Sequence, residues 1–327
     1  MTAPIAILGA GAWGTALAIK LAARFPVTLW ARDPAQADAL ATTRRNARYL
    51  PDFPLPDSIR IVADFGAATR DARCIIVATP ASGLRETVAA VSEQSVPVLW
   101  LCKGFVFDHE TAQLPHQSIA AIRKDRWGLL SGPSFAQEVA ANAPTALTLA
   151  GCNIAFAEEW SAVLRDDTLR LYASDDVPGV EVGGAVKNVL AIATGICDGL
   201  QLGDNARAAL ITRGLAEMSR FAEAVGGRRE TLMGLSGLGD LVLTCTGSLS
   251  RNRQAGLLLA AGQSLQRIQH DLGHVAEGVF AARAVRQLAA QARIEMPISE
   301  AVYGVLYENV PPRQAVGALL RREPARE

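Results

Sequence analysis

Two short stretches of the sequence have residue types and spacings suited to binding anions. The first runs from Gly9 to Gly14 and reads GAGAWG, a spacing that lets backbone N–H groups approach a pyrophosphate closely. The second runs from Ser248 to Arg253 and reads SLSRNR. Its arginines carry planar guanidinium groups that match phosphate oxygens. Taken alone, this second stretch also fits a solvated basic turn before a helix.

The glycine loop stands in the local context that a dinucleotide site requires. The apolar run Ile5 to Leu8 precedes it, and a segment with helical periodicity, Thr15 to Phe25, follows it. In such a strand–turn–helix unit, Gly9 makes the tight turn, Gly11 admits the pyrophosphate and Gly14 packs the helix on the strand. The helix N-terminus supplies free N–H groups. We therefore predict a dinucleotide cofactor here, with a merely tight turn as the alternative.

The end of the second apolar run carries residues that distinguish NAD from NADP. Ala31-Arg32-Asp33 follows Leu29-Trp30, about 20 residues beyond the glycine loop, where the adenosine ribose is recognised. An acid there favours the 2′-hydroxyl of NAD, and an arginine favours the 2′-phosphate of NADP. Both are present with Arg32 first, so NADP is slightly favoured and NAD stays open. Either residue alone is also an ordinary exposed charge.

A lysine and an aspartate in the second half of the chain could carry proton chemistry. Lys187 lies in the small and apolar stretch GGAVKNVL, where a lysine is unexpected because long cations are rarely buried without a partner. Burial would make its amine a usable proton donor or acceptor. The alternative is a helix-face lysine whose stem reaches water. Asp240 lies between flexible glycines and an apolar run, where it could also be a helix N-cap.

Two further motifs follow apolar runs in the first half. Lys103 terminates the run Val98 to Leu101, and Ser131-Gly132-Pro133-Ser134-Phe135-Ala136 follows Trp127 to Leu130. Ligands of open α/β sheets bind at the carboxyl ends of the strands, so a lysine, a backbone bend and a hydroxyl would meet a ligand there. Each motif alone is also compatible with a plain loop.

Continuous apolar runs predict the sheet that positions these motifs. Buried parallel strands have such runs instead of an alternating pattern. Helical segments separate several of them, which indicates right-handed crossovers and a parallel, Rossmann-like sheet. The expected strands are Ile5 to Leu8, Val27 to Trp30, Cys74 to Ala78, Val98 to Leu101, Trp127 to Leu130, Thr145 to Leu149 and Leu169 to Tyr172.

The amino-acid composition changes after residue 176 to long stretches of Ala, Leu, Gly, Arg and Glu, which predict helices. We expect a dinucleotide-binding domain over residues 1–176 and an all-α domain over 177–327, so the fold class is α/β followed by all-α. The expected helices are Val180 to Ile196, Asn205 to Val225, Arg253 to Ala261, Val279 to Ala292 and Ile298 to Tyr307.

Composition excludes several classes of partner. The 32 Lys and Arg residues balance the 32 Asp and Glu residues, so nothing favours nucleic acid or an anionic membrane as a partner. The five scattered cysteines contain no C-x-x-C pair and fit reduced thiols in a cytoplasm better than disulfides. The N-terminus lacks the basic region of a signal peptide. No metal-ligand or Ser-His-Asp spacing appears, and His274 is the one rival base.

The motifs occur in the order seen in bacterial NAD(P)-dependent sn-glycerol-3-phosphate dehydrogenases, and the chain resembles that family over nearly its whole length. Only the first motif is shared broadly among dinucleotide-binding folds. Ala12 and Cys102 depart from hydroxyl residues common in the family. The matching stretches are GAGAWGTALA, KG, SGPSFAQE, GGAVKNVLAIA, ARAALITRGLAEM, GLGDLVLTCT, SRNR and VAEG.

The resemblance implies roles at the matching positions. Lys187 would be the catalytic acid/base, accompanied by Asp240, with Lys103 touching both cofactor and substrate. The other implied cofactor contacts are Gly9, Gly11, Ala12, Trp13, Gly14, Arg32, Ala136, Arg251, Val275 and Glu277. The other implied substrate contacts are Gly132, Ser134, Ser250, Arg251 and Asn252. Arg253 has no implied role.

The implied reaction is hydride transfer between NAD(P)H and dihydroxyacetone phosphate, forming sn-glycerol 3-phosphate for glycerophospholipid synthesis. Arg251 and the N-terminus of a helix starting there would anchor the substrate phosphate. The apolar C-terminal helices favour a homodimer. Two alternatives are a related two-domain hydroxy-acid dehydrogenase and a dinucleotide-sensing protein without chemistry.

Overall fold

The computed structural model describes residues 3–271 and 277–322, which form two compact units. The first unit comprises Met1–Val106 and Pro115–Val177, and the second comprises Phe107–Leu114 and Pro178–Glu327. The excursion at Phe107–Leu114 forms a hairpin of strands β8 (Val106–Asp108) and β9 (Thr111–Gln113). Over the residues that the structure describes, the second unit is therefore helical apart from this hairpin, which the sequence did not indicate.

An eight-stranded sheet forms the centre of the first unit, in the order β12-β11-β10-β7-β6-β1-β2-β5. All of the apolar runs predicted as strands form strands of this sheet. β5 was missed because it is short and interrupted by Arg60. The strands are β1 (Ile5–Leu8), β2 (Val27–Trp30), β5 (Ile59–Val62), β6 (Cys74–Val77), β7 (Val98–Trp100), β10 (Trp127–Ser131), β11 (Thr145–Gly151) and β12 (Leu169–Ser174).

The sheet is mostly parallel, which confirms the Rossmann-like prediction except at one edge. Neighbouring strands from β5 to β10 are parallel, whereas β11 pairs antiparallel with β10 and then parallel with β12. The connection from β10 to β11 contains only the short helix α6 (Ala136–Ala140). A parallel return needs a longer crossover, usually a full helix, so the sheet departs from the predicted parallel arrangement at this one pair.

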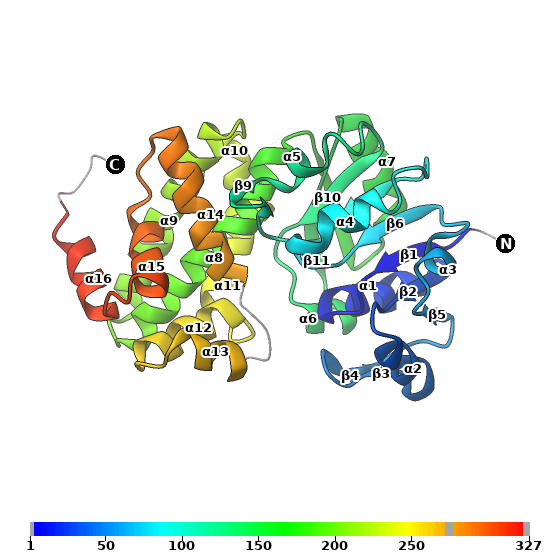
Figure 1. The fold of residues 1–327 in the computed structure, drawn as a ribbon, viewed down its shortest axis with the longest axis horizontal. Coiled ribbons are helices and arrows are strands. Elements are labelled where there is room, and N and C mark those ends of the chain that lie inside the picture. Colours follow the sequence, from blue (N-terminus) through cyan, green and yellow to red (C-terminus); the bar gives the residue numbers. More distant parts are fainter. Residues whose placement is uncertain (1–2, 272–276, 323–327) are drawn as a thin grey trace. The chain divides into compact units, whose positions relative to one another are not determined.

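Helices and short elements complete the first unit (Figure 1). The chain passes from β1 to β2 in one direction along the sheet and from β6 to β7 in the other. Right-handed crossovers therefore place the intervening helices on opposite faces. Besides the sheet and α6, the first unit contains α1 (Ala12–Ala22), α2 (Pro34–Thr43), β3 (Arg45–Asn46), β4 (Leu50–Pro54), α3 (Phe65–Thr69), η1 (Ala81–Gly83), α4 (Leu84–Ala89), α5 (Pro115–Ile119) and α7 (Ile154–Leu164).

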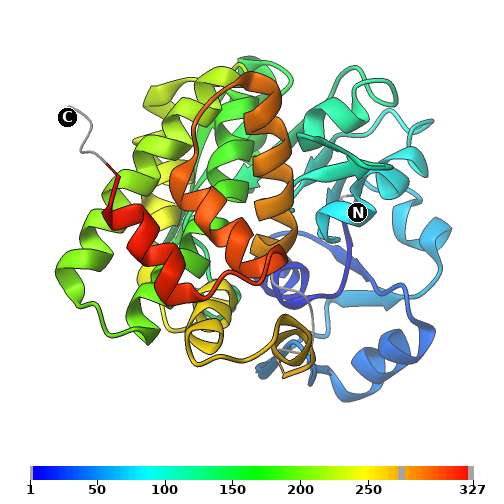
Figure 2. The same ribbon diagram turned by 60° about the vertical axis from the view of Figure 1, so that its left-hand side comes forward.

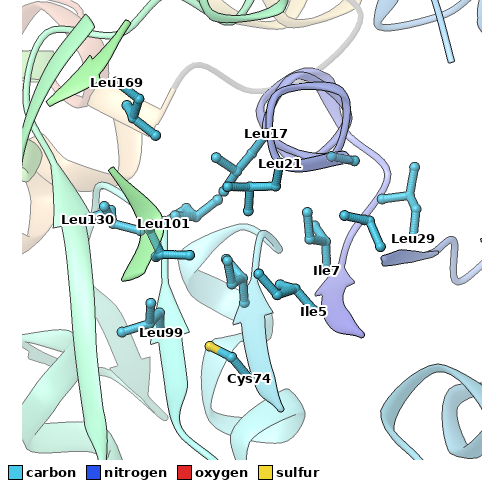
Figure 3. Close-up of a cluster of buried hydrophobic side chains, with 14 of the residues drawn as sticks. Ile5, Ile7, Leu17, Leu21, Leu29, Cys74, Leu99, Leu101, Leu130 and Leu169 are labelled. Atoms are coloured by element: carbon cyan, nitrogen blue, oxygen red, sulfur yellow. The ribbon is translucent and has the colours of Figure 1, made fainter. Parts of the chain in front are cut away.

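One apolar core of the first unit lies between α1 and the sheet. Leu17 and Leu21 of α1 point toward the sheet that contains Ile5 and Ile7 of β1 (Figure 3), and all four side chains are buried. Burying such side chains stabilises the fold by roughly 1.5–3 kcal/mol each. This packing fixes α1 against β1 and so positions the loop between them.

The second unit is a set of helices around α8 (Val177–Gly199), whose middle is wholly buried. The last three helices, coloured orange to red in Figure 2, pack on one another in chain order. All predicted helices of this half are present. Besides α8 the unit contains α9 (Asp204–Ala224), α10 (Arg229–Leu232), the π-helical turn η2 (Leu235–Gly239), α11 (Asp240–Thr246), α12 (Arg251–Ala260), α13 (Leu265–Asp271), α14 (Glu277–Ala292), α15 (Pro297–Tyr307) and α16 (Pro312–Leu320).

By length and apolar composition α8 could cross a membrane, but the whole of its most apolar stretch is buried inside the protein. Such burial is typical of a core helix that is apolar on all sides. We therefore interpret α8 as the central core helix of the second unit.

A buried carboxyl group joins α9 to α15. Glu217 is 2% exposed, and it accepts hydrogen bonds from the backbone N–H of Ile298 at 2.6 Å and of Ser299 at 3.2 Å. These are orphan donors at the N-terminus of α15. Burial raises the pKa of Glu217 to about 7, against the lowering effect of these hydrogen bonds.

The raised pKa of Glu217 predicts a pH-dependent stability. A carboxyl group that binds its proton more tightly in the folded than in the unfolded chain stabilises the fold at low pH. That contribution is lost as the pH rises from about 4.5 to about 7, which amounts to roughly 3 kcal/mol at most, at 1.36 kcal/mol per pKa unit. Glu217→Gln should remove this dependence, as measured by denaturant unfolding between pH 5 and pH 8.

The matched control is Glu223→Gln, which changes an exposed carboxylate on the same helix. The difference in unfolding free energy between Glu217→Gln and the wild type should change with pH, and that for Glu223→Gln should not. A pH-independent difference for Glu217→Gln would contradict the assignment.

Candidate functional site

The predicted site residues form two groups, one in each unit. In the first unit the glycine loop connects β1 to α1, at the carboxyl end of β1. Gly9 has a φ of +127°, and a Cβ on it would lie 2.8 Å from the backbone of Ala78, just after β6. Only glycine fits this close approach. β1 and β6 are the neighbours at which the strand order reverses, which is where ligands of such sheets bind.

The loop fits a dinucleotide pyrophosphate. A Cβ at Gly11 would meet no atom within 4 Å, so a ligand can approach the backbone there. Gly11 is the N-cap of α1 without a side-chain hydrogen bond, and Ala12, Trp13 and Gly14 form the first turn. The N–H groups of that turn and the positive end of the helix dipole are thus available to an anion.

Two polar residues that sequence reasoning missed hold the loop in place. The backbone oxygen of Ala10 accepts hydrogen bonds from Gln36 Nε2 and Asn46 Nδ2, each at 3.0 Å. Asn46 Nδ2 also lies 2.7 Å from Thr15 Oγ1 on α1, and Asn46 is 2% exposed. These residues come from α2 and β3, outside any motif, so no local signal identified them.

The two charges expected at the adenosine end have different surroundings. Asp33 is the N-cap of α2 and accepts a hydrogen bond from the N–H of Ala35 at 3.0 Å. Arg32 is exposed, and within residues 3–271 and 277–322 its guanidinium group makes no hydrogen bond or ion pair. The Asp33 carboxylate therefore accepts a hydrogen bond within the protein, whereas the Arg32 guanidinium group points to solvent.

Three predicted substrate residues of the first unit lie together. Lys103 Nζ, after β7, donates to the backbone oxygen of Gly132 at 2.7 Å and lies 3.3 Å from Ser134 Oγ, after β10. Ser134 Oγ in turn donates to the oxygen of Gly132 at 2.9 Å. Ala136 is the first residue of α6 and is buried. The carboxyl ends of two neighbouring strands thus present one ammonium group and one hydroxyl.

In the second unit, Lys187 is buried in α8 and forms an ion pair with Asp240. The two side chains are 6% and 1% exposed, and Lys187 Nζ donates to Asp240 Oδ1. The alternative of a lysine stem reaching water is therefore wrong. Asp240 is the first residue of α11, and Gly239 is the N-cap, so the alternative role of Asp240 as an N-cap is also wrong.

Thr244 completes this buried cluster. Its Oγ1 lies 2.9 Å from Lys187 Nζ and donates to the backbone oxygen of Asp240 at 2.6 Å. Sequence reasoning missed Thr244, although its spacing of four residues from Asp240 places both on one face of a helix. The carboxylate and the hydroxyl together hold the ammonium group within an apolar helix, where an unpaired charge would be costly.

Close backbone packing determines where Asp240 lies. A Cβ on Gly183, one helical turn before Lys187, would lie 2.2 Å from the backbone oxygen of Ser236 in the π-helical turn η2. The absence of a side chain at Gly183 lets η2 contact α8 directly. Because Asp240 immediately follows η2, this contact brings its carboxylate to the lysine. π-Helical turns frequently mark functional sites.

The predicted phosphate segment forms the first turn of α12. Ser250 is the N-cap, and its Oγ accepts a hydrogen bond from the N–H of Arg253 at 3.3 Å. Arg251 follows as the first helical residue and is exposed. Glu277, at the start of α14, has a pKa raised by burial and partly lowered again by the positive charge of Arg251. Val275 lies outside the described residues.

Asn252 is buried, and both ends of its carboxamide bind within the unit. Its Nδ2 donates to Asn188 Oδ1 at 2.9 Å, and its Oδ1 accepts from the N–H of Gly278 at 3.0 Å. Asn188 follows Lys187 on α8, and Gly278 follows Glu277 on α14. Asn252 thus connects the lysine helix with the start of α14, a connection that no sequence motif indicated.

The buried thiol of Cys245, which follows Thr244 in the chain, is unreactive. Burial raises the pKa of Cys245 to about 12, so the reactive thiolate form is absent near neutral pH. Within the described ranges, no group of three or more His, Cys, Asp or Glu side chains could hold a metal ion.

Comparisons with known proteins cover both units. The profile for the N-terminus of NAD-dependent glycerol-3-phosphate dehydrogenase matches residues 4–157, and the profile for the C-terminus matches 176–317. Glycerol-3-phosphate dehydrogenase (NAD(P)+) of Thiobacillus denitrificans is 56% identical over 98% of both chains. That of Aromatoleum aromaticum is 54% identical over 99% of both chains.

The fold agrees with a solved structure. The crystal structure of glycerol-3-phosphate dehydrogenase from Coxiella burnetii superimposes with a TM-score of 0.93 at 43% identity. The match covers 98% of this chain and 99% of the other.

The contact between Gly183 and η2 generates a stability prediction. Gly183→Ala would place a Cβ against the oxygen of Ser236, so η2 must move and take Asp240 with it. Overpacking of this kind costs typically 1–3 kcal/mol, so we expect about that loss. Differential scanning calorimetry would measure it as a lower midpoint of unfolding.

Gly317→Ala is the matched control in a helix of the same unit. A Cβ there would meet only the flexible end of Arg321, at 3.3 Å, so the change should be neutral or stabilise α16 by up to about 1 kcal/mol. If Gly183→Ala unfolded at the wild-type temperature, the packing of η2 on α8 would not constrain Asp240.

Proposed function

The chain belongs to the NAD-dependent glycerol-3-phosphate dehydrogenase family, and from that premise we propose that Lys187 is the acid/base of its reaction. The reaction reduces dihydroxyacetone phosphate with NAD(P)H and one proton, giving sn-glycerol 3-phosphate and NAD(P)+, and it is reversible. The buried pair of Lys187 with Asp240 carries this proposal. Steady-state oxidation of NADPH in the presence of dihydroxyacetone phosphate tests the activity, with small keto acids as the comparison.

The first unit would hold the cofactor. The N–H groups at the start of α1 would bind the pyrophosphate, with Trp13 and Ala136 beside the dinucleotide. When bound, the nicotinamide supplies or accepts the hydride. In the second unit, Arg251, Val275 and Glu277 are the proposed cofactor contacts, and the nearness of Arg251 to Glu277 supports placing those two together.

Lys187 would exchange a proton with the oxygen on C2 of the substrate. Negative charge grows on that oxygen as the hydride reaches the carbonyl carbon, and an ammonium group both stabilises the charge and donates the proton. Asp240 and Thr244 orient the ammonium group. In the direction of oxidation the neutral amine accepts the proton from the hydroxyl group.

Arg251 would anchor the substrate phosphate. It is exposed at the N-terminus of α12, where its guanidinium fork and the free N–H groups of the first turn favour an anion. Anchoring a remote phosphate positions the reacting carbon. Lys103, Gly132 and Ser134 are the proposed contacts to the substrate in the first unit, and Ser250 and Asn252 those in the second.

Family membership disfavours the two alternatives. A hydroxy-acid dehydrogenase would use an arginine for a carboxylate, whereas the matched relatives are glycerol-3-phosphate dehydrogenases over their whole length. A protein that only senses dinucleotides has no need to bury an ammonium group with a carboxylate and a hydroxyl, at considerable energetic cost.

Three properties of the protein in the cell stay predictions. All five cysteines are free thiols, which supports the cytoplasm as its location. A homodimer is expected from the apolar C-terminal helices, and its mass in solution would show it. Reduction of dihydroxyacetone phosphate would supply glycerophospholipid synthesis.

Removing the ammonium group should abolish most turnover. Lys187→Met is expected to lower kcat by roughly 10²- to 10⁴-fold, the usual contribution of a positioned acid/base, while NADPH still binds in a fluorescence titration. Because this variant removes the ammonium partner of the buried Asp240 carboxylate, a second variant combines Lys187→Met with Asp240→Asn. Both should have the low kcat.

Lys124→Met, at an exposed position, is the control and should keep the wild-type kcat. Near-normal turnover in the double variant would refute the role of Lys187, because that variant carries no uncompensated charge.

The different surroundings of Arg32 and Asp33 predict a preference for NADPH. Arg32→Ala should lower kcat/KM for NADPH at least about tenfold, because a charge-assisted hydrogen bond to the 2′-phosphate is lost. The value for NADH should change little. Asp33→Asn should leave the ratio unchanged, since asparagine caps a helix as well as aspartate does. Equal losses with both cofactors in Arg32→Ala would contradict this assignment.

A further inference from the structure

We propose that Arg253 is a positioning residue, which holds the phosphate-binding first turn of α12 in place through Asp198 of α8. This inference rests on the proposed role of Arg251 as the phosphate anchor. Arg253 lies two residues beyond Arg251 and belongs neither to the proposed cofactor contacts nor to the proposed substrate contacts. Its contacts are made to α8 and to the cap of its own helix.

The guanidinium group of Arg253 forms a fork on one carboxylate oxygen. Its Nε and Nη2 lie 2.9 and 2.7 Å from Asp198 Oδ2. The two side chains are 19% and 13% exposed, so this ion pair is partly shielded from water. Charge-assisted, two-pronged contacts of this kind are the stronger and more directional ion pairs.

The backbone of Arg253 is held as firmly as its side chain. Its N–H donates to the Oγ of the cap residue Ser250. Its carbonyl oxygen packs on α8 so closely that a Cβ on Gly195 would lie 2.1 Å away. Gly195 and Asp198 are three residues apart on α8 and so share one face. Arg253 is thus fixed by its amide, its carbonyl and its guanidinium group.

Helix geometry separates Arg253 from the phosphate anchor. Residues two apart on an α-helix point in directions roughly 200° apart, at about 100° per residue. With Arg253 turned onto Asp198, Arg251 lies on another side of α12, where it is exposed. Releasing the fork would let the first turn of α12 shift and would move Arg251 and the N–H groups beside it. Substrate affinity should suffer before the chemical step does.

Asp198 has a second arginine partner that serves as an internal control. Arg207, in the first turn of α9, donates from Nη1 to Asp198 Oδ1 at 3.0 Å and from Nη2 to Asp204 at 2.7 Å. Because Arg207 occupies the other carboxylate oxygen, Asp198 keeps a charged partner when Arg253 is replaced. Arg207→Met in turn leaves the fork on α12 intact.

The experiment measures kcat and both KM values with dihydroxyacetone phosphate and NADPH. Arg253→Met and Asp198→Asn should each raise KM for dihydroxyacetone phosphate about tenfold, as expected for the loss of a charge-assisted contact that orders a binding site. KM for NADPH should rise as well, since Arg251 is also a proposed contact of the cofactor, whereas kcat should stay within about twofold. The double variant should be no worse than either single variant, because both remove the same contact.

Two further variants complete the test. Arg253→Lys keeps the charge without the fork and should recover part of the affinity. Arg207→Met should leave KM for dihydroxyacetone phosphate near the wild-type value.

Three outcomes would overturn the proposal. If Arg253→Met raised KM while Asp198→Asn did not, Arg253 would contact the phosphate directly. If both variants lowered only the unfolding temperature and left KM unchanged, the pair would serve the fold alone. If Arg207→Met raised KM as much as Arg253→Met, the effect would belong to Asp198 in general. The wild-type assay with dihydroxyacetone phosphate tests the proposed function separately.

Discussion

The need to bury one ammonium group governs how the second unit is built. Lys187 is 6% exposed within α8, and an unpaired charge there would cost several kcal/mol. Asp240 and Thr244 compensate it, but they can reach it only because η2 contacts α8 backbone to backbone at Gly183. Gly183 therefore serves the same end as the ion pair, since it sets the distance at which η2 approaches α8 next to the lysine.

The anion sites that we propose for the two units are of different physical kinds. In the first unit the donors are backbone N–H groups at the start of α1, and the loop before them is held by Gln36 and Asn46. Their geometry depends on the packing of one helix on one strand. In the second unit the donor is the side chain of Arg251, whose position depends on how α12 sits on α8. Long-range packing therefore has more influence on the second site than on the first.

Neighbouring residues in one motif can have separate tasks. In the run SRNR, Ser250 caps α12, Arg251 is exposed, Asn252 connects α8 with α14, and Arg253 binds Asp198. The sequence shows only a cluster of polar donors, which suits a phosphate. The direction of each side chain follows from the helical rotation of about 100° per residue and from the surfaces that α12 meets.

The sequence by itself determined the features that depend on local interactions. Continuous apolar runs identified the buried strands, and the glycine spacing identified the loop after β1, because both patterns arise within one element and its neighbour. Only the tertiary structure decided the antiparallel β11 and the hairpin in the second unit. The pairing of Lys187 with Asp240 across 53 residues was expected from the family resemblance alone, and the structure shows it. Those features depend on which surfaces meet when helices and strands pack, and a contact between distant segments leaves no periodic signal in either one.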